Sequence, residues 1–169
     1  MGVRLSAVEE AGARTFEEFF REEHPRLYRT LLLVTGDRGE ADDLAQEAMA
    51  RVYERWDRVG TAGSPVGYLY RTAFNLNRRR IRRLALRRRA DRLESRPQAE
   101  PHSVEDRQDV IRAVASLPLP LREAVVLVEW LDLDTAEAGR ILGIEPVSVR
   151  GRLYRAREML RAVLRVTDE

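Results

Sequence analysis

Apolar residues recur along most of this chain at the three- and four-residue spacing of amphipathic helices. One side of the first predicted helix carries Phe16, Phe19, Phe20, Leu27 and Leu31. Pro25 lies inside this run and predicts a kink or a break there, because proline removes a helical hydrogen bond. No strand-like alternation of apolar and polar residues stands out. The pattern therefore predicts an all-α protein.

Turn and capping residues divide the first half of the chain into further helices. Asp37, followed by Glu40, resembles a capping box and begins a second helix that we expect to reach about Asp57. Ser64 and Pro65 predict the start of a third helix, after a loop that contains two glycines. The apolar residues of this third helix are Leu69, Ala73 and Leu76 on one side and Tyr70, Phe74 and Ile81 on the neighbouring side.

The second half contains two predicted helices and then a helix-turn-helix. The helices run over Val104–Ser116 and Arg122–Leu131, with a break at 117–120 that contains two prolines. In the segment Thr135–Arg157, a short helix capped by Asp134 ends at Gly143, and an arginine-rich helix follows. A helix of this kind can lie in the DNA major groove.

The arginine-rich helix has a buried stripe and an exposed face. The stripe consists of Val149, Leu153, Ala156 and Leu160. The side chains that point away from it are Val147, Gly151, Tyr154, Arg155 and Glu158, with Ser148 and Arg150 on its flanks. The exposed face therefore offers hydrogen-bond donors and one aromatic ring. An amphipathic helix with an ordinary solvated arginine face is the competing interpretation.

These elements predict two small helical domains joined by a flexible linker. We expect an N-terminal arm at 1–15, a first helical domain at 16–90, a linker at 91–103 and a helix-turn-helix domain at 104–169. Nine arginines and one aspartate lie between Asn77 and Arg92, at the end of the first domain. We expect no built-in regulatory domain after the second helical domain.

Composition excludes several classes of site. The 169 residues are 44% hydrophobic and 34% charged, as in folded soluble proteins. No cysteine is available for a disulfide or a zinc thiolate, and His24 and His102 show no metal-ligand spacing. We therefore expect no metal, no cofactor and no catalytic residue. Charged residues interrupt every short apolar run, which predicts a cytoplasmic protein without membrane insertion.

All 30 basic residues are arginine, and the formal net charge is +2. Arginine presents planar, bidentate donors that suit phosphate and the O6 and N7 atoms of guanine. The sequence pI of about 9.4 is compatible with binding to nucleic acid.

An acidic cluster, DDLAQE, marks the polar side of the second predicted helix. Its members are Asp42, Asp43, Gln46 and Glu47. A solvated acidic face is one interpretation. A docking surface for a basic partner is the other, since complementary charge sets orientation and association rate.

The acidic cluster belongs to the first of three segments whose order and spacing together resemble a known family. The segments are EADDLAQEAMARVYERW, SPVGYLYRTAFNLNRRRIRR and ILGIEPVSVRGRLYRAREMLR. From Phe16 to Arg165 the chain resembles the extracytoplasmic-function group of bacterial RNA polymerase sigma factors, and most of all the SigE-type group of actinobacteria. The resemblance implies that core RNA polymerase and promoter DNA are partners. It leaves open whether an anti-sigma factor is another.

The resemblance assigns the acidic cluster to the clamp helices of the largest polymerase subunit, and the polymerase flap is a second contact. It assigns the −10 element, with one base flipped out of the stack, to the loop Val59–Ser64 and the third helix. The implied −10 residues are Tyr68, Arg71, Asn75, Arg78, Arg79 and Arg82. Tyr70 would stack on a base or pack in the core, and we favour the core. Asparagine is a poor helix former, so Asn75 needs another reason to be in a helix.

In the second domain, the implied −35 recognition helix is Pro146–Leu164. Its implied DNA contacts are Ser148, Arg150, Tyr154 and Arg155, whereas Arg152 and Arg157 lie nearer the buried stripe and suit phosphates or intramolecular pairs. The chain departs from the family pattern at four positions: Gly139 replaces alanine, Val147 and Gly151 replace glycine and serine, and Arg79 replaces aspartate. A glycine inside a helix costs about 1 kcal/mol, so we expect Gly139 to weaken its helix.

Two other functions remain as alternatives at this point. A stand-alone helix-turn-helix regulator would bind duplex DNA tightly without polymerase. An enzyme of helical fold has little support, because the sequence lacks a phosphate-binding glycine loop and a histidine–carboxylate cluster.

Overall fold

The computed structural model describes residues 14–61, 63–90 and 105–167. The predicted N-terminal arm lies almost entirely outside these residues, and the predicted linker lies wholly outside them. All regular secondary structure in the described part of the chain is helical, so the predicted all-α class is confirmed. No helix in these ranges is long and apolar enough to cross a bilayer.

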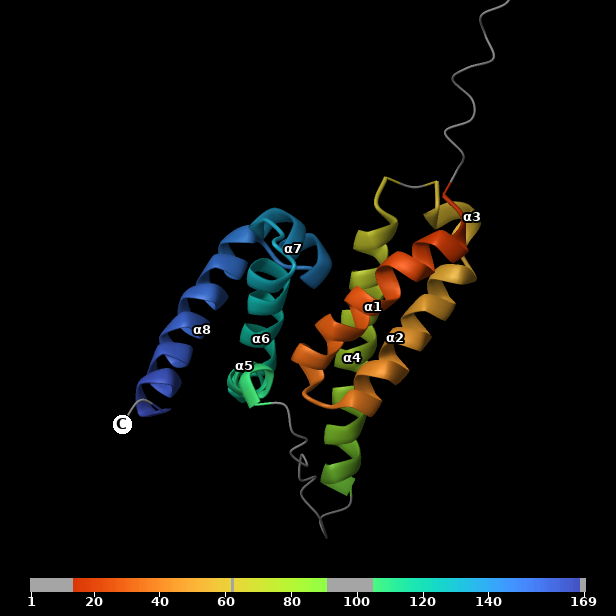
Figure 1. The fold of residues 1–169 in the computed structure, drawn as a ribbon. Coiled ribbons are helices and arrows are strands. Elements are labelled where there is room, and N and C mark those ends of the chain that lie inside the picture. Colours follow the sequence, from red (N-terminus) through yellow and green to blue (C-terminus); the bar gives the residue numbers. More distant parts are fainter. Residues whose placement is uncertain (1–13, 62, 91–104, 168–169) are drawn as a thin grey trace, which may run out of the picture.

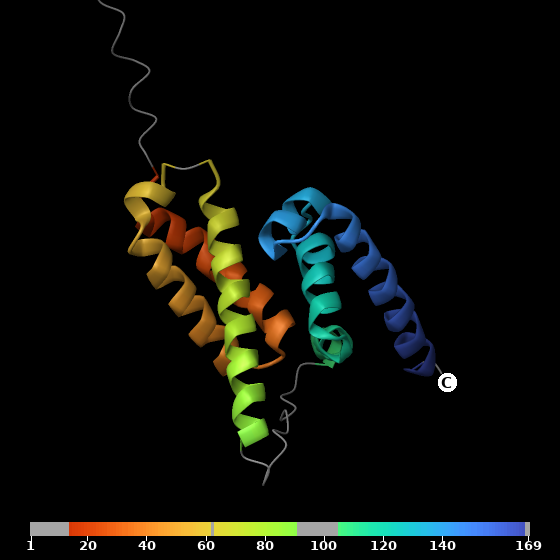
Figure 2. The same ribbon diagram turned by 180° about the vertical axis from the view of Figure 1, so that it is seen from behind.

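The first domain contains four helices: α1 (Phe16–Thr35), α2 (Arg38–Tyr53), α3 (Trp56–Val59) and α4 (Pro65–Ala90). Helices α1 and α2 form a hairpin, and α4 packs against α2 and crosses α1 (Figures 1 and 2). The centre of this domain is filled by fully buried residues from all three long helices, among them Phe19, Leu27, Leu31, Met49, Leu69 and Phe74.

Helix α1 runs without interruption through Pro25, so the predicted break does not occur. Its N-terminus is closed by a capping box between Thr15 and Glu18, and it ends at Gly36, whose φ of 72° is left-handed. Pro25 is exposed, whereas Phe19 and Leu27 on either side of it are fully buried. Packing of both halves against the same core offsets the hydrogen bond that proline removes.

Helix α2 begins as predicted and ends earlier than predicted. The Asp37 carboxylate accepts a hydrogen bond of 2.8 Å from the Glu40 N–H. The Glu40 carboxylate pairs with Arg80 of α4. The helix stops at Tyr53 and not near Asp57, because the chain turns to place Trp56 of α3 with its ring centroid 5.0 Å from that of Phe19 and 5.5 Å from that of Phe16.

The second domain contains α5 (Glu105–Ser116), α6 (Leu119–Val125), η1 (Val126–Trp130), α7 (Thr135–Leu142) and α8 (Pro146–Thr167). The predicted helix Arg122–Leu131 is therefore divided between α6 and η1, a segment of wider π-helical turns. Apolar periodicity does not distinguish the two kinds of turn in so short a segment.

The helix-turn-helix is present where the sequence predicts it. The Asp134 carboxylate caps α7 by accepting hydrogen bonds of 2.8 Å from the N–H groups of Ala136 and Glu137. Gly143 ends α7 with a φ of 69°. A Cβ added to Gly139 would lie 2.6 Å from the Ile144 carbonyl oxygen. The expectation that Gly139 only weakens α7 is therefore incomplete, since the turn after α7 passes too close for alanine.

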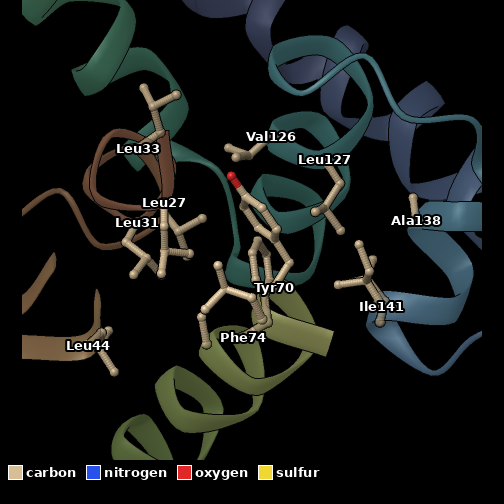
Figure 3. Close-up of a cluster of buried hydrophobic side chains, with 14 of the residues drawn as sticks. Leu27, Leu31, Leu33, Leu44, Tyr70, Phe74, Val126, Leu127, Ala138 and Ile141 are labelled. Carbon is tan, nitrogen blue, oxygen red and sulfur yellow. The ribbon is translucent and has the colours of Figure 1, made fainter. Parts of the chain in front are cut away.

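The two domains pack directly against each other. Helix α1 contacts α5, α6 and η1, and α4 contacts α7. Figure 3 shows Tyr70 and Phe74 of α4 at this junction, near Leu27 of α1, Leu127 of η1 and Ile141 of α7. The described residues thus share one continuous buried core that spans both domains.

Candidate functional site

The acidic cluster lies on the exposed side of α2. Asp43, Gln46 and Glu47 are exposed and Asp42 is half-buried. Asp42 accepts a hydrogen bond of 2.8 Å from the Gln46 amide, and Glu47 accepts one of 2.7 Å from Arg51. Among the described residues, Asp43 has no hydrogen-bond or ion-pair partner. This carboxylate is therefore free to meet a charge on another molecule.

The loop before α4 is shorter than predicted. Val59 is buried as the last residue of α3, so the predicted loop Val59–Ser64 begins at Gly60. Ser64 caps α4 by accepting a hydrogen bond of 3.1 Å from the Gly67 N–H. The loop thus connects the end of α3 to the start of α4, and both of these helix ends are fixed in the first domain.

Four of the six predicted −10 residues lie on one exposed stripe of α4, and a fifth, Arg78, lies on the neighbouring stripe. The exposed stripe holds Arg71, Asn75, Arg79 and Arg82. The other stripe, at i, i+4 and i+8, holds Tyr70, Phe74 and Arg78, and it faces the second domain. Tyr68 is half-buried, and its hydroxyl accepts a hydrogen bond of 3.0 Å from Arg55. The structure thus separates residues that the sequence treats as one set.

Tyr70 is a core residue, as favoured from the sequence. Its side chain is 3% exposed, and burial raises the pKa of the Tyr70 hydroxyl above its ordinary value. Phe74 is fully buried. Neither ring can stack on a base while the two domains remain in contact.

Arg78 is engaged across the domain junction rather than exposed. Its guanidinium donates to the Glu123 carboxylate of α6, with an Nη2–Oε2 distance of 2.9 Å, and to the Leu142 carbonyl of α7 at 3.2 Å. The side chains of Arg78 and Glu123 are only 23% and 2% exposed. Nothing in the sequence singles out Glu123, apart from its position as a charged residue within the largely apolar run LREAVVLV.

The predicted −35 residues lie together on the outer face of α8. Ser148, Arg150, Tyr154 and Arg155 are all exposed, Tyr154 to 69%. Arg155 donates to the Gly151 carbonyl at 3.3 Å, which leaves its terminal nitrogens available. Arg157 forms an ion pair with Glu129 of η1, the intramolecular role predicted for it. The stripe residues Val149, Leu153 and Ala156 are buried.

A cavity of about 670 Å³ lies between the two domains next to the candidate −10 loop. Gly63 and Ser64 line it, together with Arg26 of α1, Arg71 of α4 and Arg140 of α7. Three arginines and one carboxylate, Glu137, thus line the cavity, which extends to the helix-turn-helix and offers guanidinium groups to a phosphate.

Two family descriptions match this chain, one to each domain. Sigma-70 region 2 matches residues 19–93, and Sigma-70 region 4 matches residues 107–160. The first match covers the acidic cluster and α4, and the second covers the helix-turn-helix.

Characterised proteins from actinobacteria resemble almost the whole chain. The extracytoplasmic-function (ECF) RNA polymerase sigma factor SigE of Mycolicibacterium smegmatis is 32% identical over 165 residues, which span 92% of this chain and 64% of that protein. The factor SigM of Mycobacterium tuberculosis is 31% identical over 95% of this chain and 83% of its own length. The RNA polymerase sigma-E factor of Streptomyces coelicolor is 30% identical, over 90% of this chain and 88% of its own.

Two solved structures share the fold. The sigma factor RpoE of Bartonella quintana, in complex with the anti-sigma factor NepR, matches with a TM-score of 0.80 and 20% identity over 89% of this chain and 97% of its own. The protein CnrH, in complex with the cytosolic domain of CnrY, matches with a TM-score of 0.65 and 22% identity over 92% of this chain and 91% of its own.

Proposed function

The chain belongs to the extracytoplasmic-function family of RNA polymerase sigma factors, and from this premise we propose that it directs core polymerase to promoters. On this proposal it recognises −10 and −35 elements and helps to melt the −10 element. The proposal rests on one observation. The same chain presents an exposed acidic face on α2 and an exposed face with arginines and a tyrosine on α8. The protein acts as an initiation factor, and the chemistry of RNA synthesis belongs to the polymerase.

Docking on core polymerase is assigned to Asp42, Asp43, Gln46 and Glu47. Asp43 is the strongest member, because its carboxylate is exposed and unpaired within the described residues. Basic side chains on the clamp helices of the largest subunit would supply the complementary charge. Because α2 packs on α1, α3 and α4 and leaves this face outside, docking needs no rearrangement of the first domain.

Recognition of the −10 element is assigned to the loop at 60–64 and to α4. The exposed residues Arg71, Arg79 and Arg82 suit backbone phosphates, and the Asn75 amide can both donate to and accept from a base edge. The Tyr68 ring, held by Arg55, would support a flipped base beside the loop. Arg79, where the family has aspartate, adds another phosphate contact.

Recognition of the −35 element is assigned to the first three turns of α8. Arg150, Tyr154 and Arg155 with Ser148 form one outward face, which a major groove can accommodate. Val147 on the same face is 63% exposed and suits an apolar contact with a thymine methyl group. On the polymerase, contacts with the flap would hold this domain apart from the first domain, so that each domain reaches its own promoter element.

An anti-sigma protein is a further proposed partner. Among the solved structures that share this fold, RpoE is bound to the anti-sigma factor NepR, and CnrH is bound to the cytosolic domain of CnrY. A partner that covers either face would block initiation without destroying the fold.

Two substitutions separate the proposed roles. Asp43→Arg should weaken binding to core polymerase by about tenfold, because it places like charges at the docking face, and should leave −35 duplex binding unchanged. Arg155→Ala should cost about 1–3 kcal/mol in duplex binding and leave core binding unchanged. Fluorescence anisotropy with labelled protein measures both affinities.

Matched controls lie on the same helices or domains. Glu17→Arg reverses an exposed charge on α1, and Arg161→Ala removes an exposed arginine further along α8. Both controls should behave like the unmodified protein. Loss of both activities in each folded test variant would contradict the division of roles, and tight duplex binding without polymerase would favour a stand-alone regulator.

A further inference from the structure

We infer that the Tyr70–Phe74–Arg78 stripe of α4 is also the docking surface for the protein's own second domain. The promoter backbone and the Glu123 carboxylate then compete for the same guanidinium. This inference rests on the proposed function only for the identity of the competing anion. The docking contact itself is a property of the described residues.

All three nitrogens of the Arg78 guanidinium donate to the second domain. Its Nε donates to both oxygens of Glu123, at 3.1 and 3.3 Å, and its Nη2 donates to Oε2 at 2.9 Å. Its Nη1 donates to the Leu142 carbonyl at 3.2 Å. A phosphate can therefore bind Arg78 in full only after these contacts break.

Glu123 depends on this contact for its counter-charge. Its side chain is 2% exposed in the junction, and Arg78 is its ion-pair partner among the described residues. A buried carboxylate without a partner is strongly destabilising, whereas separation of the domains would return it to water. Removing Arg78 leaves this carboxylate unpaired, and neutralising Glu123 leaves the partly buried Arg78 guanidinium without its counter-charge, so either change should shift the protein toward separated domains.

The neighbouring residue, Arg122, ties the same helix to α1. Its Nη1 donates to the Val34 carbonyl at 2.6 Å, and its Nη2 donates to the Leu117 carbonyl at 2.8 Å and to the Ala115 carbonyl. Burial lowers the pKa of Arg122 below its ordinary value. Two adjacent residues of α6 thus bind two helices of the first domain, Arg122 to α1 and Glu123 to α4.

With the two domains in contact, which we call the closed form, one stripe of α4 is covered and the neighbouring stripe is exposed. Arg71, Asn75, Arg79 and Arg82 remain exposed while Arg78 is occupied. The closed protein keeps a partial phosphate-binding surface, and opening completes it. Apparent affinity for DNA then rises with the fraction of open molecules.

The test uses Glu123→Gln in the full chain, with two measurements on each sample. Small-angle X-ray scattering should give a larger radius of gyration than the unmodified protein, because the domains separate. Anisotropy with fluorescein-labelled oligothymidylate should show about fivefold tighter binding, because Arg78 is released to phosphate. Glu129→Gln, which removes the exposed ion pair with Arg157 inside the second domain, should change neither quantity.

Arg78→Gln separates opening from DNA binding and covers the case in which Glu123→Gln fails to fold. It should also enlarge the radius of gyration, yet it should not tighten oligothymidylate binding. The exchange of charges, Arg78→Glu with Glu123→Arg, should restore the compact form without restoring a guanidinium at position 78. Helical circular dichroism checks that each variant is folded.

The outcomes separate this inference from the proposed function. An unchanged radius of gyration in both Glu123→Gln and Arg78→Gln would overturn the docking contact. A larger radius with unchanged oligothymidylate affinity in Glu123→Gln would overturn the competition for Arg78. Failure of the unmodified protein to support initiation by core polymerase would overturn the proposed function and leave the docking contact standing.

Discussion

Gly139 illustrates how a single residue can be fixed by its neighbours across a turn. Gly139→Ala should lower the free energy of unfolding by about 1–2 kcal/mol, because the new Cβ would lie 2.6 Å from the Ile144 carbonyl and this overlap outweighs the gain in helix propensity. Gly151→Ala is the matched control, since its Cβ would meet nothing nearer than Arg155 at 4.0 Å. Gly151→Ala should raise the free energy of unfolding by up to about 1 kcal/mol. Urea unfolding measures both, and a stabilised Gly139→Ala protein would contradict the steric argument.

At the same scale, residue exposure could be predicted only where it depends on the helix itself. The rotation of about 100° per residue in an α-helix correctly predicts that Ser148, Tyr154 and Arg155 are exposed and that Leu153 is buried. It does not give the position of Arg78, because the partner of that residue lies 45 positions away in another domain. Long-range ion pairs leave no periodic signal in a sequence.

At the scale of elements, the capping of α7 sets the stability of the helix-turn-helix. Asp134→Ala should cost about 1 kcal/mol, because two N–H groups in the first turn of α7 lose their acceptor. Asp134→Ser should retain most of the stability, since serine also caps helices. Thermal unfolding followed by circular dichroism compares the two, and equal destabilisation would show that the cap contributes little.

Helix starts were easier to predict than helix ends. Asp37, Ser64 and Asp134 each cap a helix where the sequence indicates, because a cap is a local interaction. The end of α2 and the continuity of α1 through Pro25 depend instead on the aromatic packing of Trp56 and on the shared core. At the end of α2 and at Pro25, tertiary contacts therefore outweigh the helix propensities of the individual residues.

At the scale of the whole molecule, the two domains are one packed body within the described residues, joined by polar contacts at Arg78 and Arg122 and by Tyr70 and Phe74. The sequence predicts two domains and gives no sign of this junction, since each domain alone satisfies its helical patterns. The acidic face of α2 and the outer face of α8 remain accessible on this body. On the proposed function, we expect polymerase and the −35 element to bind these two faces before the junction opens.

Transcription by core RNA polymerase tests the proposed function most directly. With this protein added, core polymerase should produce transcripts that start at fixed positions on a randomised promoter library, and the selected sites should share −10 and −35 elements at constant spacing. Asp43→Arg should reduce the yield of these transcripts at limiting protein concentration, because binding to core polymerase is about tenfold weaker, and Glu17→Arg should not. The absence of any start-specific transcript, together with tight duplex binding by the protein alone, would contradict the proposed function.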